Sequence, residues 1–335
     1  MERRKLPSLG LPFACFAATQ FLGALNDNVF KLLVIFLLIS MRTAQTADTV
    51  VTSVSALFVL PFLLFSHAGG VLADRFSKRT IILSLKYLEI AIMAAGCAAI
   101  ALKSQAGLYA SLLAMCTQSA LFGPSKYGII PELVPDAVLS AANAVTEALT
   151  YLAIIIGTFL GSYLLLNWLD GDFLALGRVC VALAVAGTIA AHGIRRTPSA
   201  GTQRKLSPAF VFDFLRTIRW MKADVHLSMA AWGSVYFLFL AAFIQQNTIL
   251  YGCSAMGLDE IRSGYLFPVA ALGIATGALV SGKLSGRNIE FGIVPVGAAG
   301  LAATCMALAR MEASWSNVLS AIFSAGFFTG SSSCR

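Results

Sequence analysis

Long apolar runs, separated by short polar breaks, recur along the whole chain. A run of about 20 apolar residues is what an α-helix needs to cross the hydrocarbon core of a bilayer. Only 12% of the residues are charged, whereas a soluble domain carries about 25%. Because backbone polar groups in lipid must be paired within their own segment, the pattern predicts an all-α, multi-pass membrane protein. The runs fall at 11–40, 50–72, 80–103, 107–131, 140–168, 172–194, 226–252, 262–284 and 289–309, and another begins near 313.

Lysine and arginine are concentrated in alternate polar breaks. One set of breaks holds fifteen of them and the intervening set holds four. Positive side chains favour the cytoplasmic side of a membrane, so the N-terminus is predicted to be cytoplasmic. This asymmetry also explains the net charge of +8 without a nucleic-acid partner. The breaks that are rich in lysine and arginine are the N-terminus, 74–79, 195–222 and 283–290.

The longest polar segment follows the sixth apolar run. We interpret it as a cytoplasmic linker, 195–225, between an N-terminal six-helix bundle, 1–194, and a C-terminal bundle, 226–335, that is incomplete. Two eleven-residue segments, Gly69–Arg79 and Gly277–Arg287, share basic and serine positions, which supports two related halves. The expected architecture is therefore two six-helix bundles with the second cut short, about ten transmembrane helices in all.

The break after the second run carries a recognisable motif. Residues 70–79 fit G-x-x-x-D-R-x-G-R/K-R/K, with Ser77 in place of a glycine, and so resemble the hallmark motif of the major facilitator superfamily. Asp74 suits either a helix N-cap or a pair with a neighbouring cation. The alternative is an ordinary positively charged loop. We expect gating, rather than substrate contact, from Gly70, Asp74, Arg75, Lys78 and Arg79.

The first run contains charges that are costly at bilayer depth. On an α-helix Gln20, Asp27 and Lys31 fall on one narrow face, Asn28 flanks it and Asn26 points away from it. Intramembrane charges usually mark a substrate or ion pathway. Asp27 and Lys31 are also spaced as an i,i+4 pair, so a self-neutralising pair buried for packing is the alternative.

Other runs carry polar side chains as well. Lys86 and Glu89 are spaced as a mutual i,i+3 pair in the third run. The fourth run contains Gln118 and Lys126, and its end is expected to be irregular. Glu147 lies on a polar face of the fifth run, for which helix packing is the alternative role.

The usual signatures of enzymes and metal sites are missing from the sequence. The three histidines are far apart, and the seven cysteines are scattered without a C-x-x-C spacing. His-x4-Asp, G-x-S-x-G and H-E-x-x-H are all absent. We therefore expect no metal, no cofactor and no enzymatic activity.

Three segments together resemble one family, the bacterial lysophospholipid transporters. They are Thr19–Lys31, Gly70–Arg79 and Phe122–Glu132. Residues 232–247 are more similar to the transporter half of the fused lysophospholipid acyltransferase/acyl-carrier-protein synthetase. The resemblance implies a major facilitator fold that moves lysophospholipids, mainly lysophosphatidylethanolamine, across the bacterial inner membrane by alternating access. It also implies functional coupling to an acyltransferase.

Within this framework the charged residues receive expected roles. Asp27, with Asn28 and Lys31, is expected to contact the zwitterionic headgroup or a coupling cation, and Lys126 the phosphate. Gln118 and Glu147 complete the predicted substrate site, and the apolar remainder of the cavity suits an acyl chain. The alternatives are a facilitator for another solute, such as a drug, sugar or peptidoglycan fragment, or an inactive truncated remnant or membrane module of a lipid-modifying enzyme.

Overall fold

The computed structural model describes most of the N-terminal part of the chain and three helices near its end. The chain divides into two compact units, Met1–Phe214 and Leu215–Arg335. The division falls within the predicted linker, 195–225, most of which lies outside the described residues, so the domain bounds stay a prediction. The continuously described segments are 9–41, 47–198, 266–285, 293–310 and 314–333, with scattered residues between 201 and 257.

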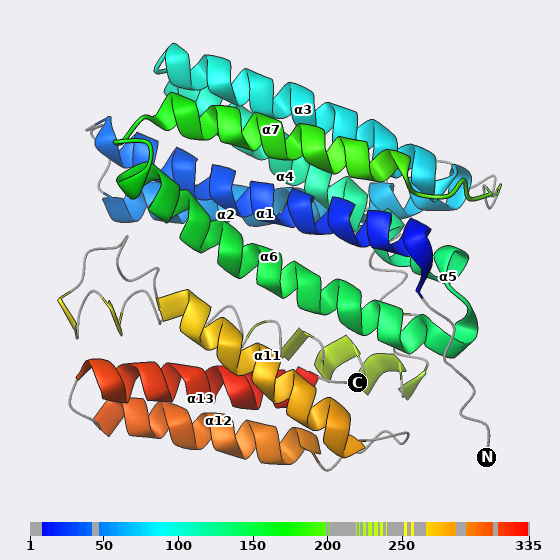
Figure 1. Cartoon of the computed structure of the whole chain (residues 1–335), viewed down its shortest axis with the longest axis vertical. Coiled ribbons are helices and arrows are strands. Elements are labelled where there is room, and N and C mark those ends of the chain that lie inside the picture. The colour runs from blue at the N-terminus through cyan, green and yellow to red at the C-terminus, as the bar shows by residue number, and fades with distance from the viewer. Residues whose placement is uncertain are drawn as a thin grey trace. The chain divides into compact units, whose positions relative to one another are not determined.

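Six long helices build the N-terminal unit (Figure 1). Each contains a stretch long and apolar enough to cross a membrane, as the apolar runs predict. Two short helical turns, α5 (Ile130–Leu133) and η1 (Asp136–Val138), connect α4 to α6. The long helices are α1 (Gly10–Ser40), α2 (Ala47–Arg75), α3 (Lys78–Ala101), α4 (Gln105–Gly128), α6 (Leu139–Asn167) and α7 (Phe173–His192).

Helix α1 lies at the centre of this unit. In the most apolar window of α1, 56% of the residues are buried within the protein, whereas the figure for α2 is 22%. Helix α1 packs mainly against α6 and α7, between which it runs in Figure 1, and also contacts α4 and α2. Its polar side chains therefore face other helices rather than lipid.

Close approach of α1 and α6 depends on one glycine. A methyl group at Gly157 would lie 2.6 Å from the carbonyl oxygen of Leu25. A methyl group at Gly161, one turn further along α6, would meet its nearest neighbour at 3.5 Å, an ordinary contact. Small residues at a helix interface let two backbones pack closely in a membrane.

The end of α4 is less irregular than expected. The helix continues through Pro124 and ends at Gly128, after which α5 starts with Pro131 in its first turn. Proline removes one backbone donor but is tolerated inside membrane helices when neighbouring groups compensate. The irregular backbone therefore begins at Ile129, later than Pro124.

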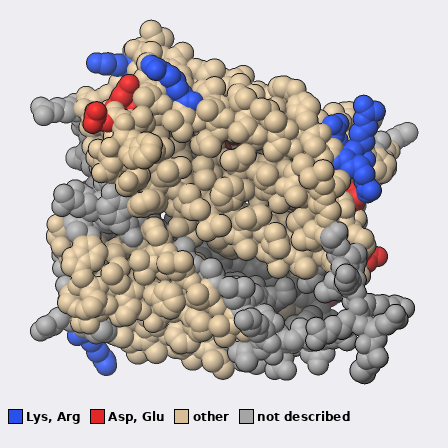
Figure 2. Space-filling view, in the orientation of Figure 1, with Lys and Arg blue, Asp and Glu red and all other residues tan. Residues whose placement is uncertain are grey.

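The surface charges of the N-terminal unit gather at the two ends of its helices. Figure 2 shows lysine and arginine at both ends and an uncharged band between them. The turn between α2 and α3 and the residues after α7 supply one end, which holds Arg75, Lys78, Arg79, Arg195 and Arg196. The band between the ends matches the hydrocarbon zone of a bilayer.

The described part of the C-terminal unit contains α11 (Leu266–Ser285), α12 (Ile293–Arg310) and α13 (Trp315–Ser333). Helix α13 packs against both of the others. A methyl group at Gly277 of α11 would lie 2.0 Å from the carbonyl oxygen of Phe327 on α13, so these two backbones also approach closely. The predicted run at 226–252 lies largely outside the described residues.

Candidate functional site

Many of the buried polar side chains that the structure describes in the N-terminal unit form two clusters. We call them the Asp27 cluster and the Lys126 cluster. The Asp27 cluster comprises Asn26, Asp27, Lys86, Glu89, Gln118 and Ser119, and the Lys126 cluster comprises Gln20, Lys126, Tyr127, Thr146, Glu147 and Thr150.

Asp27 is held by a hydroxyl of α4. Ser119 Oγ donates a hydrogen bond of 2.6 Å to Asp27 Oδ2 and also lies 3.2 Å from Gln118 Oε1. Gln118 in turn donates through Nε2 to the carbonyl oxygen of Leu85 on α3. The second oxygen, Asp27 Oδ1, is buried and has no hydrogen-bond partner among the described residues. Asp27 therefore keeps one oxygen available for a donor that the described residues do not supply.

Lys86 and Glu89 form the mutual ion pair that their spacing predicts. Both side chains are 2% exposed, and Lys86 Nζ lies 2.5 Å from Glu89 Oε2. Asn26 Nδ2 donates to the other Glu89 oxygen at 2.9 Å. A methyl group at Gly187 of α7 would lie 2.7 Å from Lys86 Nζ, so this glycine leaves the space for the ammonium. The pair thus bonds α3 to α1 and packs against α7.

The pair of Asp27 and Lys31, considered as the alternative to a substrate role, is not formed, although the structure describes both residues. Lys31 Nζ lies over the ring of Phe58 on α2, 4.8 Å from its centroid. The two side chains lie one turn apart on α1, but Asp27 contacts α4 and Lys31 contacts α2. Asn28 donates to the carbonyl oxygen of Ala24 in its own helix, at 2.8 Å. The structure therefore does not bring Asn28 and Lys31 into contact with Asp27.

The Lys126 cluster connects α1, α4 and α6. Lys126 Nζ donates to Thr150 Oγ1 at 2.7 Å. Gln20 Oε1 accepts from the same hydroxyl at 3.0 Å. Glu147 accepts a hydrogen bond of 2.6 Å from the Tyr127 hydroxyl instead of pairing directly with Lys126. Gln118 and Lys126, predicted together, therefore belong to different clusters.

The motif at 70–79 makes contacts at one end of the N-terminal unit. Lys78 forms an ion pair with Glu132 of α5, and Arg79 Nε donates to the carbonyl oxygen of Ile194 at 2.7 Å. Asp74 lies inside α2, so of its two predicted roles it does not act as an N-cap; Ser77 occupies the N-cap position of α3. Gly70 and Arg75 belong to the last turns of α2.

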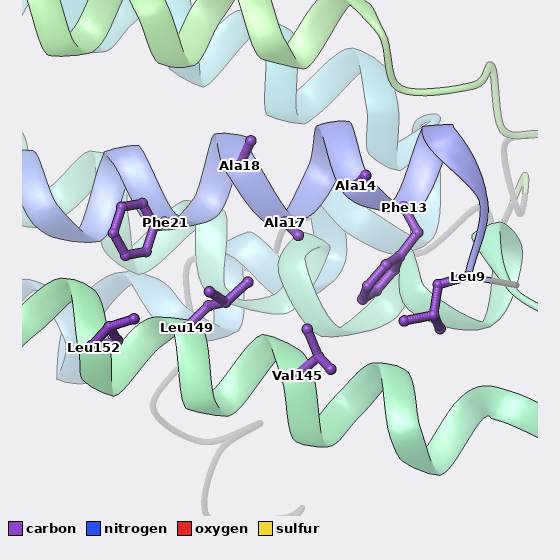
Figure 3. A pocket seen from close by; sticks show the side chains of 9 residues that line it. All are labelled: Leu9, Phe13, Ala14, Ala17, Ala18, Phe21, Val145, Leu149 and Leu152. Atoms are coloured by element: carbon purple, nitrogen blue, oxygen red, sulfur yellow. The ribbon is translucent and has the colours of Figure 1, made fainter. Parts of the chain in front are cut away.

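An apolar groove lies between α1 and α6 (Figure 3). Its volume is about 460 Å³. On α6 two of its lining residues, Val145 and Leu149, directly precede Thr146 and Thr150 of the Lys126 cluster in the sequence. The lining residues are Leu9, Phe13, Ala14, Ala17, Ala18, Phe21, Val145, Leu149 and Leu152.

Sequence reasoning missed two side chains of the Asp27 cluster. Helical geometry places Asn26 off the functional face, yet it is fully buried and bonded to Glu89. The sequence does not single out Ser119, because serine is common in membrane helices and often bonds only its own backbone. A polar side chain next to Gln118 in an apolar run was the one available signal.

The six apolar helices of the N-terminal unit and the buried charges between them define a multi-pass helical membrane protein. The family model described as Major Facilitator Superfamily matches residues 13–334. The chain therefore belongs to the major facilitator superfamily.

Known proteins of similar sequence or fold agree with this assignment. The lysophospholipid transporter LplT of Salmonella heidelberg is 29% identical over 273 residues, which cover 79% of this chain and 64% of that protein. The chain thus spans less than two thirds of this relative. A bacterial homologue of the human lysosomal transporter Spinster matches 97% of this chain and 75% of its own, at 18% identity and a TM-score of 0.59. The structure of the Escherichia coli fucose:proton symporter matches 97% of this chain and 82% of its own, at 13% identity and a TM-score of 0.70.

Proposed function

We propose that this protein is a transporter that carries lysophospholipids across a membrane by alternating access. The similarity to LplT over 79% of the chain is the observation that carries the proposal. The fold and the buried charges of the N-terminal unit support it, because intramembrane charges usually mark a transport pathway. We infer no enzymatic activity.

The two clusters suit the two charges of a zwitterionic headgroup. Asp27 Oδ1 is an acceptor without a partner among the described residues, and it suits an ammonium group. Lys126 is a cation whose described hydrogen bond goes to a neutral hydroxyl, and it suits a phosphate. Gln20 of the Lys126 cluster precedes Asp27 by seven residues, which is about 10 Å along a helix. A phosphate and an ammonium joined by a short linker can bridge sites at such a separation.

Asn28, Lys31, Gln118 and Glu147 take supporting roles in this proposal. Gln118 orients Ser119 beside Asp27, and Glu147 fixes Tyr127 beside Lys126, whose Nζ lies 5.1 Å from the tyrosine ring centroid. Asn28 and Lys31 border the site without touching Asp27.

The acyl chain of a lysophospholipid needs an apolar surface beside its headgroup. The groove between α1 and α6 offers such a surface, because apolar side chains alone line it. Its volume of about 460 Å³ lies within the range of about 300–1,000 Å³ of small-molecule sites. The proximity of the groove to the Lys126 cluster on α6 favours an amphiphilic substrate over a small polar one.

The motif at 70–79 is proposed to control gating. Its contacts with Glu132 and Ile194 tie the start of α3 to α5 and to the segment after α7. We place this end of the unit, and the N-terminus, on the cytoplasmic side of a bacterial inner membrane, because its breaks are rich in lysine and arginine. We also propose that an acyltransferase consumes the transported lipid.

A transport assay tests this function. The purified chain is reconstituted into liposomes, and the uptake of radiolabelled lysophosphatidylethanolamine is measured with and without unlabelled competitors. We expect protein-dependent uptake that unlabelled lysophospholipid competes away and that sugars or peptidoglycan fragments do not. Competition by a polar solute alone would assign the protein to another substrate class.

A further inference from the structure

The ammonium of Lys31 rests on an aromatic ring rather than on a carboxylate. Its Nζ lies 4.8 Å from the ring centroid of Phe58 on α2. The Phe58 ring also contacts the ring of Phe62, at a centroid distance of 6.0 Å. A cation over an aromatic face is stabilised by the ring quadrupole, and more strongly where water is excluded.

Lys31 has an alternative partner on its own helix. Asp27 lies four residues earlier, the spacing at which a lysine and a carboxylate meet on a helix. The charged groups that interact electrostatically with Asp27 are Lys31, Lys86 and Glu89. Lys86 is already paired with Glu89. Of the two cations, Lys31 is the one that lies on the same helix as Asp27 and forms no ion pair among the described residues, so its ammonium is free to turn toward the open oxygen of Asp27.

We propose that Phe58 is a specificity-determining residue, because its ring holds Lys31 away from Asp27 and keeps the carboxylate open to the ammonium group of an incoming headgroup. This inference rests on the proposed function. The flexible four-carbon stem of lysine lets the ammonium reach either partner without movement of α1. Without the ring, Lys31 neutralises Asp27 and competes with the substrate.

The size of the effect follows from the strength of the contact. Cation–π interactions contribute about 0.5 to 2 kcal/mol, which corresponds to a factor of about 2 to 30 in an equilibrium constant. We therefore expect Phe58→Leu to weaken the binding of lysophosphatidylethanolamine by about 2- to 30-fold. A lysophospholipid without an ammonium group, such as lysophosphatidylglycerol, should be affected much less.

Binding to the purified chain in detergent, followed by calorimetry, tests the proposal. Phe62→Leu is the matched control, since it removes a neighbouring ring of α2 that contacts no cation among the described residues. Phe58→Trp should retain binding, and Phe58→Leu should have no effect in a Lys31→Met background. Unchanged binding in Phe58→Leu, or a loss that persists in the Lys31→Met background, would overturn the proposal.

A second measurement needs no lipid. Thermal unfolding of the parent chain, Asp27→Asn, Lys31→Met and the double variant forms a double-mutant cycle. The cycle gives the interaction free energy between these two residues. We expect little coupling in the parent chain and a clear coupling once Phe58→Leu is added. A coupling that Phe58→Leu leaves unchanged would overturn the inference, even if the parent chain bound no lysophospholipid and the proposed function had failed.

Discussion

The buried ion pair of Lys86 and Glu89 permits a sharp prediction about stability. Replacement of Lys86 by methionine leaves the Glu89 carboxylate buried, with Asn26 as its remaining described donor. Breaking a buried pair by removing one partner costs about 3–5 kcal/mol. Because both side chains are only 2% exposed, we expect Lys86→Met to lose stability near the upper part of this range.

The double replacement Lys86→Met with Glu89→Gln should recover most of that loss. It removes both charges, keeps the side-chain volumes similar and leaves an oxygen that can accept from Asn26. Replacing a buried ion pair by neutral groups of similar volume is often close to neutral.

Thermal unfolding of the three proteins in the same detergent measures the difference. Equal losses in the single and the double variant would show that a buried, uncompensated charge is not the cause. A single variant as stable as the parent chain would contradict the burial of the pair.

Two further predictions concern α1. Gly157→Ala should lower the free energy of unfolding by about 1–3 kcal/mol, because its methyl group would lie 2.6 Å from the Leu25 carbonyl oxygen. Gly161→Ala should be tolerated when both variants are compared by thermal unfolding. Equal effects of the two variants would contradict the close packing of α1 and α6. Ser119→Ala removes the 2.6 Å donor that positions Asp27. It should lower the free energy of unfolding by about 1.5–3 kcal/mol, the contribution of a hydrogen bond to a charged group, and should also weaken lysophospholipid binding. Ser119→Thr, which keeps the hydroxyl, should bind normally, and a loss in both variants would point to packing instead.

The helices could be predicted because their signal is local. The length and hydropathy of an apolar run depend only on its own residues. The run at 80–103 therefore predicts α3 (Lys78–Ala101) without reference to the neighbouring helices. The Lys86–Glu89 pair was predictable for the same reason, since three residues on a helix bring two side chains together. The membership of the superfamily agrees with the motif at 70–79.

The partners of the site residues could not be predicted, because they depend on packing between helices. Asp27 and Lys31 are spaced for a pair, but α4 supplies Ser119 to one and α2 supplies Phe58 to the other. Asn26 is excluded from the functional face by helical geometry alone, yet α3 places Glu89 against it. A helical wheel shows which way a side chain points, and it cannot show what the neighbouring helix offers.

The role of Asp27 in lysophospholipid transport is the central claim, and one measurement tests it most directly. Uptake of radiolabelled lysophosphatidylethanolamine into proteoliposomes is compared for the parent chain, Asp27→Asn and the control Asp136→Asn, which changes an exposed carboxylate in η1. Loss of a charged hydrogen-bond partner should lower uptake by Asp27→Asn about 10- to 100-fold, while Asp136→Asn transports normally. Uptake by Asp27→Asn equal to that of the parent chain, at equal reconstituted amounts, would contradict the account.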